Sequence, residues 1–422
     1  MHNAHGDIDH RDLVHGIAAN RGQFVQFLLQ VFFVGALVGM TRTVLPVLSE
    51  SDFGLAAGAF TTLASFVVIF GVIKATLNLL AGRFSDRYGR KRVLVAGWLF
   101  AIPVPFLLLI ADSWGWVLLA TVFLGINQGL AWSMALNSKL DLTHAHQRGL
   151  VNGANEFAGY GGVAVAGYLA AIVAEQLGAR EGLFWFGLAV IGLALALAVW
   201  MARDTLPWAH AQQQANGNGK VPALRSGLGF FAHATWGNRS LLAINQAGLV
   251  EKFTDTIIWL FVPILLVSRG ADLVTAGFLV GIYGVVWGAG QLITGPASDR
   301  LGRRGLITWG MWLCGAGIVA IVLTHSVWVW GLALAATGVG MAMLYPTLGA
   351  AVADHCEPVE RAGILGVYRF WRDFGYAVGA LLLGLVATFT GGIEAGFWFV
   401  GVAMVLSGLW IALGLAPRGQ NH

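Results

Sequence analysis

The sequence predicts an all-α integral membrane protein in which twelve transmembrane helices form two pseudo-symmetric six-helix bundles. Three observations predict this class: the composition, a series of long apolar runs, and a motif that occurs once in each half of the chain. Of the 422 residues, 57% are apolar and 11% are charged, whereas soluble proteins have about 45–50% and about 25%. So few charges cannot cover soluble domains, and an aromatic content of 12% excludes a disordered chain.

Twelve apolar runs are each long enough to cross about 30 Å of hydrocarbon as a helix. They are 23–48, 57–81, 91–111, 114–138, 149–174, 182–202, 241–268, 273–297, 305–324, 327–353, 361–388 and 393–416. The first six form a predicted N-terminal bundle, 23–202, and the last six a predicted C-terminal bundle, 241–416. The connection 203–240 is rich in Gln, Gly and Pro and is predicted to be a cytoplasmic linker.

Both ends of the chain are polar and are predicted to be cytoplasmic tails, 1–22 and 417–422. The N-terminal tail lacks the apolar stretch of a signal peptide. With both termini inside, 18 of the 25 Lys and Arg residues fall on the cytoplasmic side and two, Arg180 and Arg269, fall outside. Because Lys and Arg are retained on the cytoplasmic side of membrane proteins, this bias predicts a multi-pass protein of the cytoplasmic (inner) membrane. The spread of the basic residues over many short loops argues against nucleic-acid binding.

A ten-residue motif follows the second span and recurs after the eighth. Residues 82–91 read GRFSDRYGRK and residues 295–304 read GPASDRLGRR, at an offset of 213 positions. Gly82 and Gly295 are expected to allow a neighbouring helix to approach closely. Asp86 and Asp299 are expected to accept backbone N–H bonds at a helix start, where the helix dipole favours negative charge. The basic residues are expected to anchor this end at the cytoplasmic headgroups.

With twelve spans, a central linker and this repeated motif, the chain resembles the major facilitator superfamily. The resemblance implies alternating access, in which helices 1, 2, 4, 5, 7, 8, 10 and 11 line a central cavity. It also implies that the motif is a gate that stabilises the state closed to the cytoplasm. The implied gating residues are Gly82, Asp86, Arg87, Gly89 and Arg90, with Gly295, Asp299, Arg300, Gly302 and Arg303 in the second copy. The competing interpretation is that these residues only fix the topology.

Nine ionisable residues lie inside the predicted spans. They are Arg42, Lys74, Glu156, Glu251, Lys252, Asp255, Arg369, Arg372 and Asp373. Each costs about 3 kcal/mol or more if it faces lipid near the bilayer centre, so most are expected to face a wet cavity or to pair with one another. All nine fall on the helices that line the cavity in the superfamily, and spans 3, 6, 9 and 12 contain no internal charge.

Roles follow from the chemistry of these residues. The carboxylates Glu156, Glu251 and Asp255 are candidates for proton coupling, and Lys74, Arg369 and Arg372 for holding an anionic group. Arg42 is expected to snorkel towards the outer surface or to close an outer gate. Further candidates for substrate binding or coupling are Arg42, Asn78, Gln128, Asn155, Lys252, Trp287, Gln291 and Asp373. The alternative is that Lys252–Asp255 and Arg372–Asp373 are ion pairs that only lock helices together.

The chain departs from the superfamily pattern at two places. Gly125 stands where the fourth-helix motif has Arg, and the segment after Glu156 has glycines but no Gly-Pro pair. Both departures argue against a generic multidrug antiporter, and the charged eleventh span suggests a more polar substrate. Four histidines in the N-terminal tail suggest either a metal-sensing segment or an ordinary solvated tail.

The first functional hypothesis is a monomeric secondary active transporter that exports a small solute in exchange for protons. The alternatives are proton-coupled uptake of an organic anion or a metal chelate, a lipid flippase, and a non-transporting membrane sensor with the same fold. The expected partners are a small-molecule substrate, protons and membrane lipid. No enzymatic activity, cofactor or resident metal is expected, and the absence of a P-loop argues against ATP-driven pumping.

Overall fold

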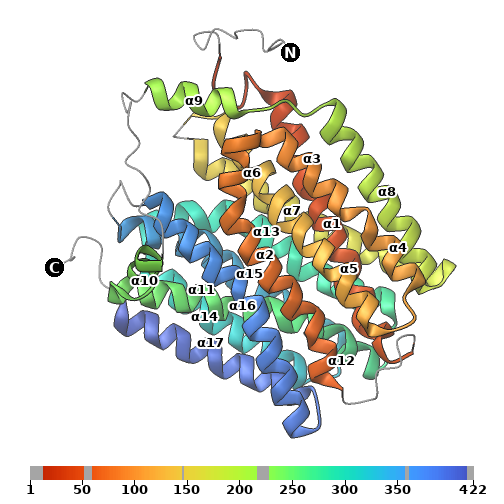
Figure 1. Ribbon diagram of the computed structural model, residues 1–422. Coiled ribbons are helices and arrows are strands. Elements are labelled where there is room, and N and C mark those ends of the chain that lie inside the picture. Colours follow the sequence, from red (N-terminus) through yellow and green to blue (C-terminus); the bar gives the residue numbers. More distant parts are fainter. Residues whose placement is uncertain (1–12, 52–58, 145–146, 216–227, 357–360, 416–422) are drawn as a thin grey trace.

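The computed structural model describes residues 13–51, 59–144, 147–215, 228–356 and 361–415, and within these ranges every regular element is a helix. Figure 1 shows the two halves of the chain as two helical bundles lying side by side. The helices of the N-terminal half are α1 (Arg21–Ser51), α2 (Phe60–Tyr88), α3 (Arg90–Ala101), α4 (Pro103–Ile110), α5 (Trp114–Asn127), the π-helical turn η2 (Gln128–Trp132), α6 (Ser133–Asp141), α7 (Arg148–Leu177) and α8 (Ala179–Trp200).

The C-terminal half repeats this order. Its helices are α11 (Arg239–Leu260), α12 (Val262–Ser268), α13 (Leu273–Leu301), α14 (Arg303–Val322), α15 (Val327–Asp354), α16 (Arg361–Thr390) and α17 (Glu394–Gly414). Eleven spans within the described residues are long and apolar enough to cross a membrane. The remaining predicted span, the seventh, 241–268, corresponds to α11 and α12, which meet at Phe261. Its lower apolar content follows from Glu251, Lys252 and Asp255, the three charged residues of α11 that lie inside this span.

Two short helices lie in the predicted linker. They are α9 (Leu206–Ala215) and α10 (Leu228–Trp236). The indole N–H of Trp371 in α16 donates to the hydroxyl of Thr235 in α10 at 3.0 Å, and the amide of Asn245 in α11 donates to the carbonyl of Ala234 at 3.0 Å. These bonds hold α10 against the C-terminal half. We call the end of the bundle that carries α9 and α10 the linker end (Figure 1).

The repeated motif is helical rather than a loop. α2 continues to Tyr88 and α13 to Leu301, so each turn is reduced to one glycine, Gly89 or Gly302. These glycines have φ of 89° and 86°, a region that L residues rarely adopt. The described state does not contain the predicted close helix approach at Gly82 and Gly295. A Cβ at Gly82 would meet no described neighbouring atom within 4 Å, and one at Gly295 would meet only Pro346, at 3.9 Å.

The two halves pack through α2 against α16 and through α7 against α13. Glycines allow the close contact between α2 and α16. A Cβ at Gly71 would lie 2.5 Å from the backbone nitrogen of Ala377, and one at Gly384 would lie 2.9 Å from Cα of Thr61. Small residues commonly let membrane helices approach in this way. Both contacts lie towards the end opposite to the linker, where the halves are closed against each other.

Candidate functional site

A cavity of about 1260 Å³ lies between the two halves, and we call it the central cavity. Its wall includes Asn78, Trp132 and Glu156 from the N-terminal half and Gln291, Tyr345 and Arg369 from the C-terminal half. Asp86, Arg303 and Leu228 of α10 also line it. Because the side chain of Asp86 is 72% exposed and Leu228 is 89% exposed, the cavity reaches the surface at the linker end.

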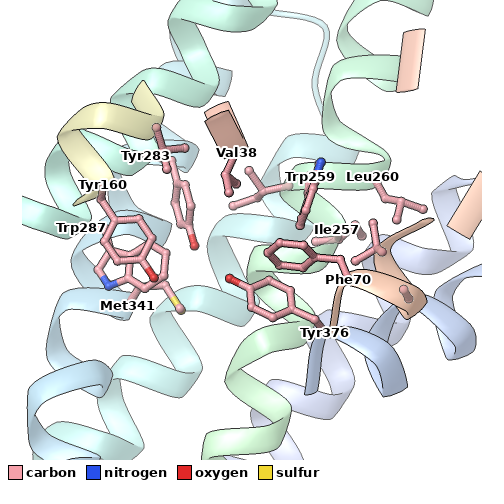
Figure 2. Close-up of a cluster of buried hydrophobic side chains, with 14 of the residues drawn as sticks. Val38, Phe70, Tyr160, Ile257, Trp259, Leu260, Tyr283, Trp287, Met341 and Tyr376 are labelled. Atoms are coloured by element: carbon pink, nitrogen blue, oxygen red, sulfur yellow. The ribbon is translucent and has the colours of Figure 1, made fainter. Parts of the chain in front are cut away.

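An ion pair across the two halves lies between the cavity and the opposite end. The guanidinium of Arg42 in α1 donates to both carboxylate oxygens of Asp255 in α11, at 2.6 and 2.7 Å. Asp255 also accepts hydrogen bonds from the hydroxyls of Tyr376 and Tyr283, the latter at 3.3 Å. Figure 2 shows these two hydroxyls directed into the same space between the helices. Arg42 and Asp255 are 3% and 0% exposed, so this is a buried pair joined by two hydrogen bonds.

Aromatic rings cover this ion pair. The guanidinium carbon of Arg42 lies 4.9 Å from the centre of the Trp259 ring. Phe70 packs edge to face on Trp259 and on Tyr376, with ring centres 4.8 and 5.6 Å apart, as Figure 2 shows. Nearer the opposite end, the hydroxyls of Thr61 and Thr388 share a hydrogen bond of 2.9 Å across the halves. The structure is therefore open at the linker end and closed at the other.

Two sequence predictions are corrected here. Arg42 does not snorkel to the outer surface, because the buried carboxylate of Asp255 holds it inside. Lys252 does not pair with Asp255. Its ammonium lies 3.7 Å from the Glu251 carboxylate and over the rings of Trp287, Tyr345 and Tyr376, at 4.8, 4.7 and 5.3 Å.

A second charged cluster lies on α16. Arg372 and Asp373 form the predicted ion pair, at 3.0 Å, and Asp373 also accepts a hydrogen bond from the amide of Asn78 in α2. Asn78 in turn accepts a bond from Ser133 at 2.9 Å. The ammonium of Lys74 lies over the rings of Phe70, Trp132 and Tyr376, at 5.5, 5.8 and 5.1 Å. No described carboxylate is within ion-pairing distance of Lys74.

Glu156 of the N-terminal half and Arg369 of the C-terminal half both line the central cavity. One oxygen of Glu156 accepts a bond from Asn155 at 2.8 Å, and the other has no hydrogen-bond partner among the described residues. Arg369 is exposed to the cavity. Gln291 also lines the cavity, whereas Trp287 is fully buried. Gln128 lies outside it and donates to the carbonyl of Val34 at 2.8 Å.

Comparisons with known proteins agree with this architecture. The model of the Major Facilitator Superfamily matches residues 27–250 and 246–421. The chain belongs to the major facilitator superfamily. It is therefore a secondary transporter and a multi-pass membrane protein.

Similar superfamily members include proteins of known and unknown cargo. The tetracycline resistance protein, class E, of Escherichia coli is 25% identical over 412 residues, which cover 94% of this chain and 96% of that protein. An uncharacterized MFS-type transporter of Salmonella typhimurium is 25% identical over 332 residues, which cover 74% and 76%. The crystal structure of the nucleoside transporter NupG has a TM-score of 0.73 at 14% identity and covers 93% of this chain and 98% of its own. That likeness shows the fold.

The superfamily motif is a hydrogen-bonded cluster at the linker end. In the first copy, Arg90 donates to Asp86 at 2.7 Å, to Ser85 at 2.9 Å and to Asp141 of α6 at 3.1 Å. Asp86 does not cap the next helix as predicted. Instead, the backbone N–H of Arg90 bonds to Asp204 at 3.2 Å, because the chain after α8 passes beside Gly89.

The second copy of the motif repeats this arrangement 213 residues later. Arg303 donates to Asp354 of α15 at 3.1 Å and to the hydroxyl of Ser298. Arg87 lies over the ring of Tyr88 at 5.3 Å, and both Arg87 and Arg300 are exposed. The side chain of Asp299 and the histidines of residues 1–12 lie outside the part of the chain that the structure describes.

Sequence reasoning missed several site residues. The offset of 213 relates Asp141 to Asp354, which bind the motif arginines of the two halves, and it also relates Arg42 to Asp255. The repeat could therefore have pointed to all four residues. Lys139 directly follows the predicted span 114–138, but it is fully buried in α6 and donates to the carbonyl of Phe27 at 3.0 Å. Within the described residues, no three His, Cys, Asp or Glu side chains gather in a way that could hold a metal ion.

Proposed function

We propose that this transporter exports a small solute in exchange for protons by alternating access. The observation that supports this proposal is the central cavity, which lies between the halves and opens at the linker end, while the buried Arg42–Asp255 pair joins the halves outside it. Transporters bind substrate near the midplane between repeats. Glu156 lines this cavity, and Glu251 and Asp255 are buried in α11. These three carboxylates offer places for a proton.

The same proposal places the protein in the inner membrane as a monomer, with both termini and the linker in the cytoplasm. The bias of Lys and Arg towards the linker end supports this orientation. In this orientation the described state is open to the cytoplasm. Export then requires that the Arg42–Asp255 pair opens while the motif clusters of Arg90 and Arg303 approach each other.

Proton-coupled uptake of an organic anion or a metal chelate is the second candidate. The supporting observation is Arg369, a cation that is exposed to the cavity and that has no ion pair with a described residue. Arg372 lies one turn away and also lines the cavity. Together these guanidinium groups provide donors for a carboxylate or a phosphate.

Transport in proteoliposomes tests both candidates. Three probes cover the classes: tetracycline and a nucleoside, which the names of similar proteins suggest, and benzoate as an organic anion. We expect an imposed pH gradient to drive flux of one probe, and we expect Glu251→Gln to abolish the dependence on that gradient. Glu175→Gln, an exposed carboxylate on α7, is the matched control and should transport normally. Flux that ignores the gradient in the wild type would disprove proton coupling.

A further inference from the structure

The four buried carboxylates inside the predicted spans differ in their hydrogen-bond partners. Asp255 accepts from Arg42 and from two tyrosine hydroxyls, and Asp373 accepts from Arg372 and Asn78. One oxygen of Glu156 accepts from its neighbour, an asparagine amide. Neither oxygen of Glu251 has a hydrogen-bond partner among the described residues, and Glu251 is 0% exposed.

A buried carboxylate that accepts no hydrogen bond is costly in its ionised form, because nothing replaces the water that it has lost. Taking up a proton removes that cost. Asp255 and Asp373 have no such need, since guanidinium groups and other donors compensate their charge. The geometry therefore separates Glu251 from the other carboxylates of the site.

Lys252 allows Glu251 to exist in both its ionised and its neutral form. At 3.7 Å its ammonium is close enough to attract an ionised Glu251 but forms no hydrogen bond with it. When Glu251 is neutral, the three aromatic rings around Lys252 still stabilise the cation. The charge of Lys252 is thus compensated in two ways, and only one of them requires an ionised carboxylate.

Other titratable groups face Glu251 from each helix that packs on it. On α11 they are Lys252 and Asp255, on α16 Tyr368, Arg372 and Asp373, on α15 Tyr345, and on α14 Cys314. Cations and anions therefore both surround the carboxyl group. No single neighbour fixes its charge, in contrast to the bidentate contact of Arg42 with Asp255.

Tyr368 connects Glu251 with the cavity. Its side chain lines the cavity, and its hydroxyl has no hydrogen-bond partner among the described residues. Its ring packs on α11 one turn before Glu251, since a Cβ at Gly248 would lie 2.6 Å from Cε2 of Tyr368. Tyr368 thus contacts both the cavity and the turn of α11 that carries Glu251, which marks a route by which a proton from cavity water can reach the Glu251 carboxyl group with no other reactant.

We propose that Glu251 is the carboxyl group that binds the transported proton, and that it exchanges this proton with the central cavity past Tyr368. The inference rests on the proposed proton coupling and deepens it, because it selects one of the three candidate carboxylates. It assigns Asp255 a different role, as the fixed partner of Arg42.

Infrared difference spectroscopy of the purified protein in lipid nanodiscs tests the assignment without a substrate. Spectra recorded across a pH step show the carbonyl band of each carboxyl group that gains a proton. We expect a band in the wild type that is lost in Glu251→Gln and kept in Asp255→Asn, Glu156→Gln and the exposed control Glu175→Gln. Glu251→Asp should restore a band at a shifted frequency, which guards against a folding defect in the glutamine variant. An unchanged band in Glu251→Gln, or its loss in Asp255→Asn, would overturn the proposal.

The rate of protonation after a pH jump tests the path. We expect Tyr368→Phe to slow the appearance of the band at least several-fold while keeping its final size, and an equal rate would refute the role of Tyr368. The proton site and the proposed proton coupling can be disproved independently of each other. A band that depends on Glu251 in a protein whose flux ignores a pH gradient would disprove coupling and leave the proton site standing.

Discussion

Replacing Arg42 with methionine would leave the Asp255 carboxylate buried without its cation. Asp255 is 0% exposed and accepts bonds of 2.6 and 2.7 Å from Arg42, so only two tyrosine hydroxyls would remain. Removing one partner of a buried pair costs about 3–5 kcal/mol, whereas replacing both with apolar groups is often close to neutral. We expect Arg42→Met and Asp255→Leu each to lower the free energy of unfolding by about 3–5 kcal/mol, and the double variant to lower it by about 1 kcal/mol.

Reversible unfolding in mixed micelles measures this cycle, with Arg87→Met as the control on an exposed arginine. The control should lie within about 0.5 kcal/mol of the wild type. The same ion pair closes the end opposite to the linker, so its loss should also expose that end. A cysteine at Ala377, which packs on Gly71, should then react faster with a membrane-impermeant maleimide. Single variants within about 1 kcal/mol of the wild type, with additive effects in the double variant, would refute the reasoning.

Three further predictions concern the helix ends. Gly89→Ala should lower the melting temperature more than Gly302→Ala. Both glycines have a positive φ, which strains an alanine by about 1–3 kcal/mol, but only at Gly89 would the added Cβ also collide, at 2.1 Å from Asp204. Equal decreases in melting temperature would contradict this. Asn238→Ala should destabilise the protein by about 1 kcal/mol, because Asn238 caps α11 through two backbone N–H groups, and an unchanged melting temperature would count against it. Backbone hydrogen bonding at the start of α13 holds the pKa of Asp272 below its usual 3.8, so its stabilising contribution is present above that pH and is lost as the pH falls through the lowered value. Between about pH 6 and about pH 3, the melting temperatures of the wild type and of Asp272→Ala should therefore approach each other as the pH falls. Asp272→Asn should keep the helix cap, and its melting temperature should lack this pH dependence.

The spans could be predicted from the sequence because the length of an apolar run is a property of each segment alone. The predictions of family and fold, both confirmed, used these runs and the repeated motif. Partners between helices were harder to predict. The spacing of Lys252 and Asp255 shows that they share a face of α11, but not that Arg42 of the other half lies opposite to it. For the same reason Gly82 was expected at a helix contact that the structure does not contain.

The internal repeat leads to one more expectation, about the state that the structure does not show. The offset of 213 relates Arg42 to Asp255, and it equally relates Glu156 to Arg369, with the charges reversed. The first pair is bonded at the closed end, whereas Glu156 and Arg369 line the open cavity and do not form an ion pair. If the halves exchange roles on closing the linker end, Glu156 and Arg369 should move towards each other as Arg42 and Asp255 separate.

Cysteines at positions 156 and 369, in a background without Cys314 and Cys356, test this exchange. We expect a bifunctional cross-linker to join Glu156→Cys to Arg369→Cys faster when Arg42→Met is also present, because loss of the first pair releases the closed end. The matched pair Glu156→Cys with Asn137→Cys, both in the N-terminal half, should react at the same rate with and without Arg42→Met. A cross-linking rate between 156 and 369 that Arg42→Met leaves unchanged would show that the two pairs are not coupled, and that the symmetry of their charges has another origin.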